Sequence, residues 1–531
     1  MKRLFNLECP TGGFTAVLTH VRVSVLITSL TFAGLSTSCV SHNQQYSAST
    51  ANLRLKMLTA VLNDIDHVYL HDRNISHLSI AAIEGLKQIE PGLSITQYDK
   101  TITAKISTVT IISDEMPSTP SGWADFIVQF LNRAEPFSYA LEKASDEQLF
   151  SAIFNSITLK LDRHSRYASA KQAAKNRIKR RGFGGIGIEV KPNVRGARIV
   201  KTHKQSPAAE AGLKAGDVII SIGNNEISGM SLDKIRRLIE GPINVPVSLR
   251  IYKNENTPAK RYLLDRTRII RKTVYATYNQ GIGVFRISRF NKDTTSSLKR
   301  EIKKARRNYG KKMQGVVIDI RDNPGGLLDQ AVDVADLFLN KGPIIATRGR
   351  HKNSIQKFKA TPGDIIAGLP LAILMNGATA SAAEILAAAL QDNGRAVLVG
   401  SSSFGKGTVQ TVLRLPNDGE IILTWARIEA PSGYALQTLG VLPTICTVGR
   451  LNASAIVNQF QKVEFKRSRK QLRLRRNADF KNAKQRDHIK KFCRWQPDIN
   501  VTPDRLVAEL ILKGQGRYAQ ATNLARIPPG S

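Results

Sequence analysis

The sequence has few cysteines, few aromatic residues and little negative charge. Only four of its 531 residues are cysteine, and neither a CxxC nor an HExxH spacing occurs, so no zinc site is indicated and we expect no metal and no cofactor. A hydrophobic fraction of 42% with 23% charged residues is typical of a folded globular protein rather than a disordered or membrane-spanning one. At roughly 150 residues per domain, the length predicts about three domains.

The shortage of acidic residues leaves a large positive charge. Lys and Arg number 78 against 42 Asp and Glu, which gives a net charge of +36 and suits nucleic acid, an anionic membrane surface or acidic substrates. The segment 462–491 is strongly basic, and for it a solvated helix face and membrane-surface contact both remain open. Aromatic residues are scarce in this C-terminal segment and the chain looks exported, so we expect no nucleic-acid partner.

The N-terminus resembles an export signal. Basic residues precede an apolar stretch of 13 residues at 23–35, which is too short to span a membrane as a helix. Small residues then lead to Cys39, as in a bacterial lipoprotein signal, except that Leu35 lies four positions before the cysteine where three is usual. Lipidation of Cys39 and ordinary removal of the signal peptide both remain open. In either case we expect the bacterial cell envelope or periplasm, with membrane anchoring through Cys39 if it is lipidated.

Two cysteines, Cys446 and Cys493, would remain after processing of the signal. In an oxidising compartment such a pair can form a disulfide. Two unrelated buried thiols explain the sequence equally well, so both interpretations stay open.

Hydrophobic periodicity divides the rest of the chain into an α/β multidomain fold. Residues 53–174 are mostly helical in pattern, while 182–253 alternates short β-like runs with glycine-containing turns around a helix at 232–239. From residue 281, continuous apolar strands alternate with amphipathic helices, which predicts a mainly parallel sheet covered by helices. The predicted strands are 281–287, 315–320, 371–375 and 396–399, and the predicted helices are 295–307, 328–339 and 382–391.

Ser381 lies where a buried strand gives way to a helix. With Glu384 three positions later it has the spacing of a capping box, and on local sequence alone a helix cap is favoured. The same junction would also expose a nucleophile beside free backbone N–H groups. Lys406 follows in a turn between two glycines, either as a surface lysine or as a desolvated amine whose lowered pKa would let it accept the serine proton.

A series of motifs in fixed order decides between these interpretations. Segments 379–385, 389–392 and 404–410, with Lys406 25 positions after Ser381, resemble the signature of carboxyl-terminal processing (tail-specific) peptidases, which are Ser/Lys enzymes. Further matches are 319–328, which resembles the family's glycine loop, 424–433, and 162–167, which resembles the segment before the family's PDZ domain. The resemblance covers about residues 145–450.

The resemblance implies a serine endopeptidase and assigns its site. Ser381 would attack the scissile carbonyl and form an acyl-enzyme, while Lys406 would act as general base. Gln410 would orient the lysine through a hydrogen bond. The backbone N–H groups of Gly326 and Ala382 would hold the oxyanion.

Two departures from the family pattern lie outside this catalytic set. Ala383 stands where the family usually has a second serine, and Asp322 replaces a frequent asparagine. Two other functions are compatible with parts of the sequence: an inactive scaffold that binds tails, which the intact Ser, Lys and Gln set disfavours, and a His-dependent serine hydrolase. None of the nine histidines lies in the motifs around Ser381 and Lys406, and no GxSxG elbow surrounds the serine.

Residues 182–253 resemble a PDZ domain, chiefly through the run at 206–224. Its carboxylate-binding loop would be Gly185, Ile186, Gly187 and Ile188, which would capture a free C-terminus while the peptide adds as a strand. The implied partners are protein substrates with exposed C-terminal tails. An adaptor or lipoprotein partner also remains open, as does membrane-surface contact through the basic extension.

The implied organisation is an export signal at 1–39, a helical region at 50–180, a PDZ domain at 182–256, a Ser/Lys peptidase domain of the tail-specific type at 275–450 and a basic extension at 451–531.

Overall fold

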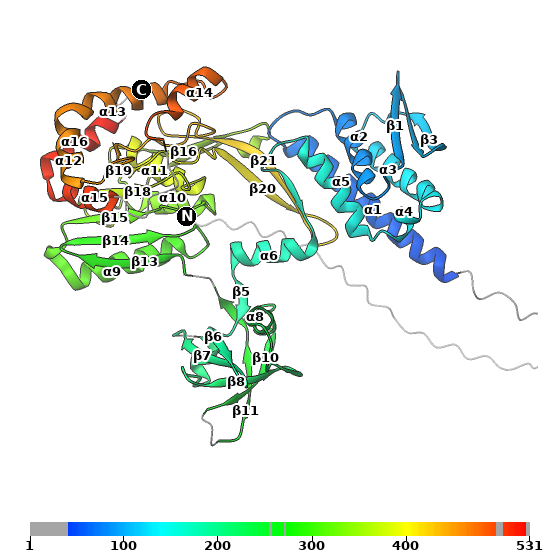
Figure 1. Cartoon of the computed structure of the whole chain (residues 1–531), viewed down its shortest axis with the longest axis horizontal. Coiled ribbons are helices and arrows are strands. Elements are labelled where there is room, and N and C mark those ends of the chain that lie inside the picture. The colour runs from blue at the N-terminus through cyan, green and yellow to red at the C-terminus, as the bar shows by residue number, and fades with distance from the viewer. Residues whose placement is uncertain (1–40, 205, 254–256, 270–271, 495–502, 527–531) are drawn as a thin grey trace, which may run out of the picture. The chain divides into compact units, whose positions relative to one another are not determined.

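The computed structural model describes residues 41–204, 206–253, 257–269, 272–494 and 503–526. The predicted export signal and Cys39 lie outside the described residues. Within them, no helix combines the length and the apolar character needed to cross a bilayer. Figure 1 labels the helices and strands in chain order.

The N-terminal region contains the expected helices around a core of large aromatic side chains that includes Trp123, Phe130 and Phe154. It also contains an antiparallel sheet of order β1-β2-β3, which the helical prediction missed. The turns between these strands use Asp99 and Ser107 with positive φ, so no glycine or proline marks them in the sequence. The elements are α1 (Ser41–Val68), α2 (Ile75–Gly85), η1 (Leu86–Gln88), β1 (Leu93–Tyr98), β2 (Thr101–Ile106), β3 (Val109–Glu115), α3 (Pro120–Ala134), η2 (Glu135–Phe137), α4 (Tyr139–Lys143) and α5 (Asp146–Leu159).

The predicted PDZ segment, together with β11 and β12 beyond its predicted end at 256, forms an antiparallel sheet of order β11-β10-β8-β7-β6, with β9 paired to β8, and a separate pair β5-β12. Alternate residues of its strands, such as Ile199, Ile219 and Leu249, are fully buried together with Ile235 of the predicted helix. Two elements precede the PDZ segment, β4 (Arg166–Ala168) and α6 (Ala170–Arg181). Its own elements are β5 (Phe183–Gly185), β6 (Ile188–Asn193), β7 (Gly196–Thr202), α7 (Pro207–Glu210), β8 (Val218–Ile222), β9 (Asn225–Glu226), α8 (Leu232–Ile239), β10 (Pro246–Tyr252), β11 (Lys260–Asp265) and β12 (Thr267–Ile269).

The α/β region is built on a sheet of order β13-β14-β15-β18-β19-β22, in which β13 and β14 are antiparallel and the following pairs are parallel. The strands β15 and β18 are buried at every residue, as their continuous apolar runs predict. The mainly parallel sheet is therefore confirmed. The elements are β13 (Val274–Asn279), β14 (Ile282–Ile287), α9 (Thr294–Tyr309), η3 (Gly310–Lys312), β15 (Gly315–Asp319), α10 (Leu328–Asp336), β18 (Leu371–Met375), α11 (Ala382–Asp392), β19 (Val397–Gly400) and β22 (Ile445–Cys446).

Successive residues of these strands face opposite helical layers. Val316 and Ile318 pack in one cluster with helices α9, α10 and α11. Val317 packs in a second cluster with apolar residues of α12, α15 and α16. The described residues beyond 450 thus cover one face of this sheet. Their elements are α12 (Ala453–Gln459), η5 (Phe460–Glu464), α13 (Phe465–Arg476), α14 (Ala483–Lys490), α15 (Asp504–Lys513) and α16 (Gln515–Ala525).

A second sheet, of order β17-β16-β21-β20 with β4 paired to β21, is antiparallel. Its strand β20 begins two residues after Lys406, so the predicted base lies in the turn that leads from the parallel sheet into this one. The remaining elements are β16 (Pro343–Arg348), η4 (Lys352–Ser354), β17 (Gln356–Lys359), β20 (Thr408–Arg414) and β21 (Glu420–Glu429).

Candidate active site

Ser381 is the residue immediately before helix α11 and has a backbone conformation that non-glycine residues seldom adopt, with φ 57° and ψ −119°. Such a conformation costs on the order of 1–3 kcal/mol and persists only where the surroundings enforce it. Gly325 contributes to those surroundings, because a Cβ on it would lie 2.8 Å from the Cβ of Ser381 and 2.8 Å from the carbonyl oxygen of Ala380. The glycine loop therefore lies directly against the predicted nucleophile.

Glu384 connects the start of helix α11 with the turn that carries Lys406. Its side chain is fully buried. Its Oε2 accepts the backbone N–H of Ser381 at 2.7 Å and the backbone N–H of Lys406 at 2.9 Å. Its Oε1 accepts the backbone N–H of Gly405 at 2.7 Å and the hydroxyl of Ser403. The expected bond from Glu384 to the Ser381 backbone is thus present, and one oxygen atom also holds the lysine.

Two effects act on the Glu384 carboxyl in opposite directions. Burial is the larger effect and raises the pKa of the carboxyl above its ordinary value, while the hydrogen bonds from Ser403 and from the backbone N–H groups oppose this shift. Both oxygens already accept N–H donors, and these bonds favour the ionised form.

Lys406 is half-buried, and this burial is the main cause that lowers the pKa of its ammonium group. The positive charges of Arg166 and Arg163 lower it further, while the carboxylates of Glu384 and Asp162 oppose the shift. A lowered pKa raises the neutral fraction of the amine, which is the form that can accept a proton.

The segment 162–167 lies near the predicted base. Burial lowers the pKa of His164, and the charge of Lys406 is the next cause. The backbone N–H of His164 donates to Asp162 Oδ1 at 2.7 Å, which fixes the segment locally. The resemblance of this segment to the family gives His164 and Arg166 no role, because nothing in the spacing of residues indicates that they lie near a lysine some 240 positions later.

Gln410 lies on strand β20, four residues after Lys406. Its Nε2 donates to Thr408 Oγ1 at 2.9 Å and to Thr424 Oγ1 at 3.3 Å. Thr424 Oγ1 in turn donates to Asp162 Oδ1 at 3.1 Å. These bonds join Gln410 to segment 162–167, and the predicted hydrogen bond to Lys406 stays a prediction.

The predicted oxyanion donors lie on the two chain segments that meet at Ser381. Gly326 is exposed, has a φ of 149° and follows Gly325, whose own N–H donates to Asn323 Oδ1 at 2.9 Å. Ala382 is the first residue of α11. Across the described ranges, neither the N–H of Gly326 nor that of Ala382 donates to a protein acceptor, as expected at a helix start. Their role in holding an oxyanion stays a prediction.

The predicted carboxylate-binding loop joins β5 to β6 in the PDZ segment. Ile186 is fully buried, and Gly187 has φ 77° with its α-carbon so close to Ser206 that an added Cβ would lie 2.3 Å from the serine Cβ. The carbonyl of Ile186 accepts the N–H of Ala208 at 3.0 Å, and that of Gly187 accepts the N–H of His203 at 2.8 Å. Internal bonds thus fix the loop, and its contact with a peptide stays a prediction.

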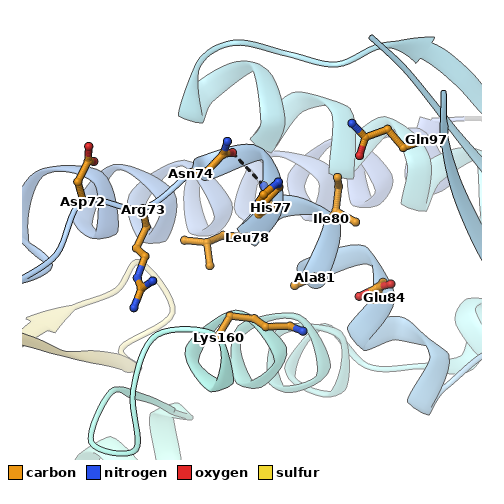
Figure 2. Close-up of a pocket in the computed structure, with 10 residues that line it drawn as sticks. All are labelled: Asp72, Arg73, Asn74, His77, Leu78, Ile80, Ala81, Glu84, Gln97 and Lys160. Atoms are coloured by element: carbon orange, nitrogen blue, oxygen red, sulfur yellow. Dashed lines mark hydrogen bonds between the residues drawn. The ribbon is translucent and has the colours of Figure 1, made fainter. Parts of the chain in front are cut away.

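A separate pocket of about 580 Å³ lies in the N-terminal region. Figure 2 shows charged side chains from α2 and its surroundings along it, including Arg73, Glu84 and Lys160, and the Asn74 side chain that caps α2. It includes no residue of the predicted catalytic set.

Over the described part of the chain, no group of three or more His, Cys, Asp or Glu side chains is placed to hold a metal ion.

Comparison with known proteins agrees with the motifs. The sequence model of peptidase family S41 matches residues 281–447, and that of the PDZ domain matches 198–253. A carboxy-terminal-processing protease of Bartonella bacilliformis is 40% identical over 302 residues, which span 56% of this chain and 70% of that protein. A carboxyl-terminal-processing protease of Synechocystis is 34% identical over 264 residues, or 49% of this chain and 61% of that protein. The solved photosystem II D1 C-terminal processing protease is 22% identical, covers 69% of this chain and 92% of its own, and has a TM-score of 0.35.

The α/β core, the PDZ domain and these matches together define a serine peptidase that carries a PDZ domain. The chain belongs to peptidase family S41, among the carboxyl-terminal-processing proteases.

Proposed function

We propose that this chain is an exported endopeptidase that binds the C-terminal tail of a protein substrate in its PDZ domain and cleaves through a Ser381–Lys406 acyl-enzyme mechanism. It would act in C-terminal processing or in quality control of envelope proteins. The observation that carries the proposal is the shared acceptor, Glu384 Oε2, on which the N–H groups of Ser381 and Lys406 converge at 2.7 and 2.9 Å. The two amide nitrogens can be no farther apart than the sum of these distances.

In the proposed acylation step, neutral Lys406 accepts the hydroxyl proton of Ser381 as its Oγ bonds to the scissile carbonyl carbon. The N–H groups of Gly326 and Ala382 stabilise the negative charge that forms on the carbonyl oxygen. The lysine ammonium then returns the proton to the leaving amine as the C–N bond breaks. Gln410 orients the lysine during these transfers.

In deacylation, Lys406 takes a proton from water as the water oxygen bonds to the acyl carbon. The ester bond to Ser381 breaks, and its Oγ receives the proton back from the lysine. The lowered pKa of Lys406 supports both steps, because the amine is neutral for a larger share of the time.

The PDZ domain supports recognition of the substrate tail. Strand β6 is at the end of its sheet, so among the described strands its outer edge has no partner. An extended peptide adds to such an edge by backbone hydrogen bonds. Its terminal carboxylate would then meet the loop Gly185–Ile188, where β6 begins.

Export to the bacterial envelope, with or without an anchor at Cys39, is supported by the apolar stretch at 23–35 and by a disulfide between Cys446 and Cys493. Disulfides persist in oxidising compartments such as the periplasm. Exposed basic residues on α13, among them Lys466, Arg469 and Lys470, support contact with an anionic membrane surface. Fractionation of cells that express the full chain tests the location, and recovery in the cytoplasm would contradict it.

The catalytic proposal is tested with purified Ser381→Ala and Lys406→Ala variants on an unfolded protein with an apolar C-terminus. Both should lose cleavage. Lys406→Arg is the matched control, because it keeps the positive charge but cannot act as a base near neutral pH. Substantial cleavage by a folded Ala variant at either position would contradict the mechanism.

Tail recognition is tested on the substrate side. The same substrate with an amidated C-terminus should show a higher KM, because the loop can no longer capture a carboxylate. A short peptide that reaches the serine without the PDZ domain serves as the control. Equal KM values for the free and amidated tails would exclude carboxylate capture by the PDZ domain.

A further inference from the structure

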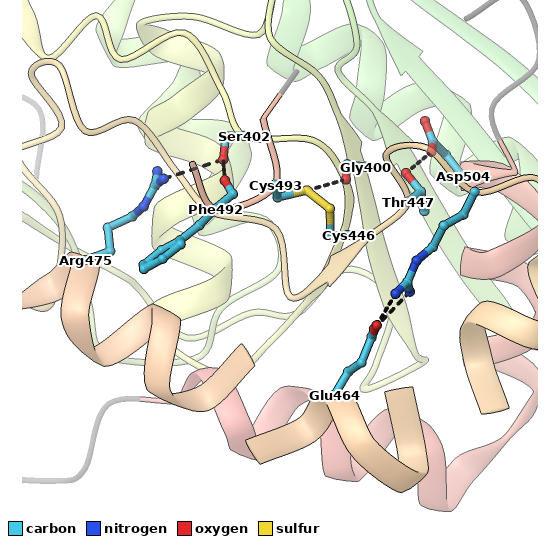
Figure 3. The surroundings of a disulfide bond; sticks show 10 residues. Gly400, Ser402, Cys446, Thr447, Glu464, Arg475, Phe492, Cys493 and Asp504 are labelled. Atoms are coloured by element: carbon cyan, nitrogen blue, oxygen red, sulfur yellow. Dashed lines mark hydrogen bonds and ion pairs between the residues drawn. A yellow bond between two sulfur atoms is a disulfide. The ribbon is translucent and has the colours of Figure 1, made fainter. Parts of the chain in front are cut away.

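The turn that carries Lys406 is held partly by the C-terminal extension. The backbone N–H of Ser402 donates to the carbonyl of Cys493 at 3.1 Å, and the Ser402 hydroxyl donates to the carbonyl of Phe492 at 3.0 Å. Figure 3 shows Ser402 between this segment and the guanidinium of Arg475. The next residue along the turn is Ser403, whose hydroxyl donates to Glu384. Contacts from the extension therefore end within a few residues of the predicted base.

The disulfide fastens the extension at this place. Cys446 ends strand β22 and pairs in register with Gly400, the last residue of β19. Its partner Cys493 has its Sγ 3.3 Å from the carbonyl oxygen of Gly400, and this is a packing contact because a disulfide sulfur carries no proton to donate. Both cysteines thus lie against the residue from which the turn starts.

Arg475 of α13 joins the same arrangement from a second side. Its side chain is almost completely buried and donates to the carbonyl of Leu439, while its other terminal nitrogen lies 3.5 Å from Ser402 Oγ. Burial lowers the pKa of Arg475 to about 10, and the charge of Glu384 is among the effects that oppose this shift. Two residues past Leu439, Val441 exchanges hydrogen bonds with Ser403. The extension thus supports the turn directly and through segment 439–441.

We propose that Ser402, held by the extension that the Cys446–Cys493 disulfide fastens, is a positioning residue for the general base Lys406, so that reduction of this disulfide lowers turnover. The inference rests on the proposed Ser/Lys mechanism. Reduction by an added dithiol breaks the S–S bond and forms two thiols, while the dithiol supplies two electrons and two protons and is itself oxidised to a disulfide. The Phe492–Cys493 segment is then no longer linked covalently to Cys446. The carbonyl groups that accept hydrogen bonds from Ser402 are therefore held less firmly.

The expected kinetic effect falls on kcat rather than KM, because the turn contacts the base and not the PDZ domain. A misplaced catalytic group costs on the order of tenfold to a hundredfold in rate.

The dependence of kcat on pH should change as well. Burial is the main cause of the lowered pKa of Lys406, so a loosened turn that admits water should move the acidic limb of kcat to higher pH. The charged groups that act on the lysine, Arg166, Glu384, Arg163 and Asp162, all remain in this comparison.

The experiment compares the full-length enzyme with and without dithiothreitol, a Cys446→Ser/Cys493→Ser double variant, and Ser402→Ala. The dithiol should lower kcat of the wild type at least tenfold at constant KM and leave the double variant unaffected. Ser402→Ala should lower kcat and shift the acidic limb in the same direction with the disulfide intact, and Ser402→Thr should restore both.

Thr447→Val is the matched control. Thr447 donates its hydroxyl to Asp504, another tie to the extension that Figure 3 shows, but its side chain has no bond to the turn. The proposal fails if Ser402→Ala keeps the wild-type kcat and pH limb, or if Thr447→Val changes them as much. Those results stand even if the double variant does not fold. Retained activity of Lys406→Ala would instead overturn the Ser/Lys mechanism itself, which separates the two failures.

Discussion

Replacement of Glu384 by glutamine tests how the site is held together. The carboxylate accepts hydrogen bonds on both oxygens, and an amide must turn its NH₂ group toward one pair of donors. The orientation that costs less directs NH₂ toward Ser403, whose hydroxyl can turn and accept a hydrogen bond. The N–H of Gly405 is then the only backbone donor that loses its acceptor, the O–H of half-buried Ser403 also gives up its bond to residue 384, and the bonds to Ser381 and Lys406 remain.

The size of the expected loss in kcat follows from the number of buried backbone donors left without an acceptor. One buried N–H left without an acceptor costs about 1–3 kcal/mol. If the whole loss is felt in the transition state, kcat falls roughly 5- to 150-fold, since about 1.4 kcal/mol corresponds to a factor of ten. Loss of the negative charge has a separate effect. The Glu384 carboxylate opposes the lowering of the Lys406 pKa, so its removal should lower that pKa further and move the acidic limb of kcat to lower pH.

The assay is a steady-state pH profile of Glu384→Gln beside a thermal denaturation curve. The matched control is Gln391→Leu in the same helix, which removes the buried bonds from Gln391 to Leu442 and Thr444 but does not touch the turn. The control should lose stability and keep the wild-type pH limb. If the acidic limb of kcat for Glu384→Gln stays in place or moves to higher pH, the assignment of Glu384 as the link between nucleophile and base is refuted.

Further predictions concern the surroundings of the site. Gly325→Ala should lower kcat tenfold or more, because residue 325 has φ 98° and its new Cβ would press on the nucleophilic serine; wild-type kinetics would contradict this steric argument. Arg166→Gln should raise the pKa of Lys406 by removing a nearby positive charge, so the acidic limb of kcat/KM moves to higher pH, and an unmoved limb would count against that influence. Arg476→Met should destabilise the fold by about 3–5 kcal/mol in urea denaturation, because it leaves the buried carboxylate of Asp392 without its ion pair; a change within 0.5 kcal/mol, roughly the scatter of surface substitutions, would show that the pair is unimportant.

Elements with one strong periodic signal were predicted well from the sequence. The apolar run at 371–375 and the helix at 232–239 have the predicted bounds, because burial on both faces or an amphipathic pattern leaves few alternatives. The sheet at 93–115 was missed, since its turns use residues with side chains in positive φ where glycine would have signalled a hairpin.

The candidate site, too, was only partly predictable from the sequence. The family motifs indicated which residues are expected to carry the chemistry, but not which contacts connect them. The bonds from Glu384 to residues 403–406 and from Ser402 to 492–493 join segments far apart in sequence, and no local pattern encodes such contacts. The basic run at 462–491 was expected to face either solvent or a membrane. Exposed residues such as Lys466 agree with either expectation, whereas Arg475 points into the fold.

The two-layer covering of the parallel sheet also sets an order in which its parts can assemble. Helices α15 and α16 contact strand β19, and α15 also contacts β15 and β18, so one face of the sheet stays uncovered until residues 504–525 have left the ribosome. A chain still being synthesised therefore has the serine and the lysine but not the finished sheet that supports them. The assembly of this sheet is thus completed by helices that are synthesised after its strands and fold back onto them.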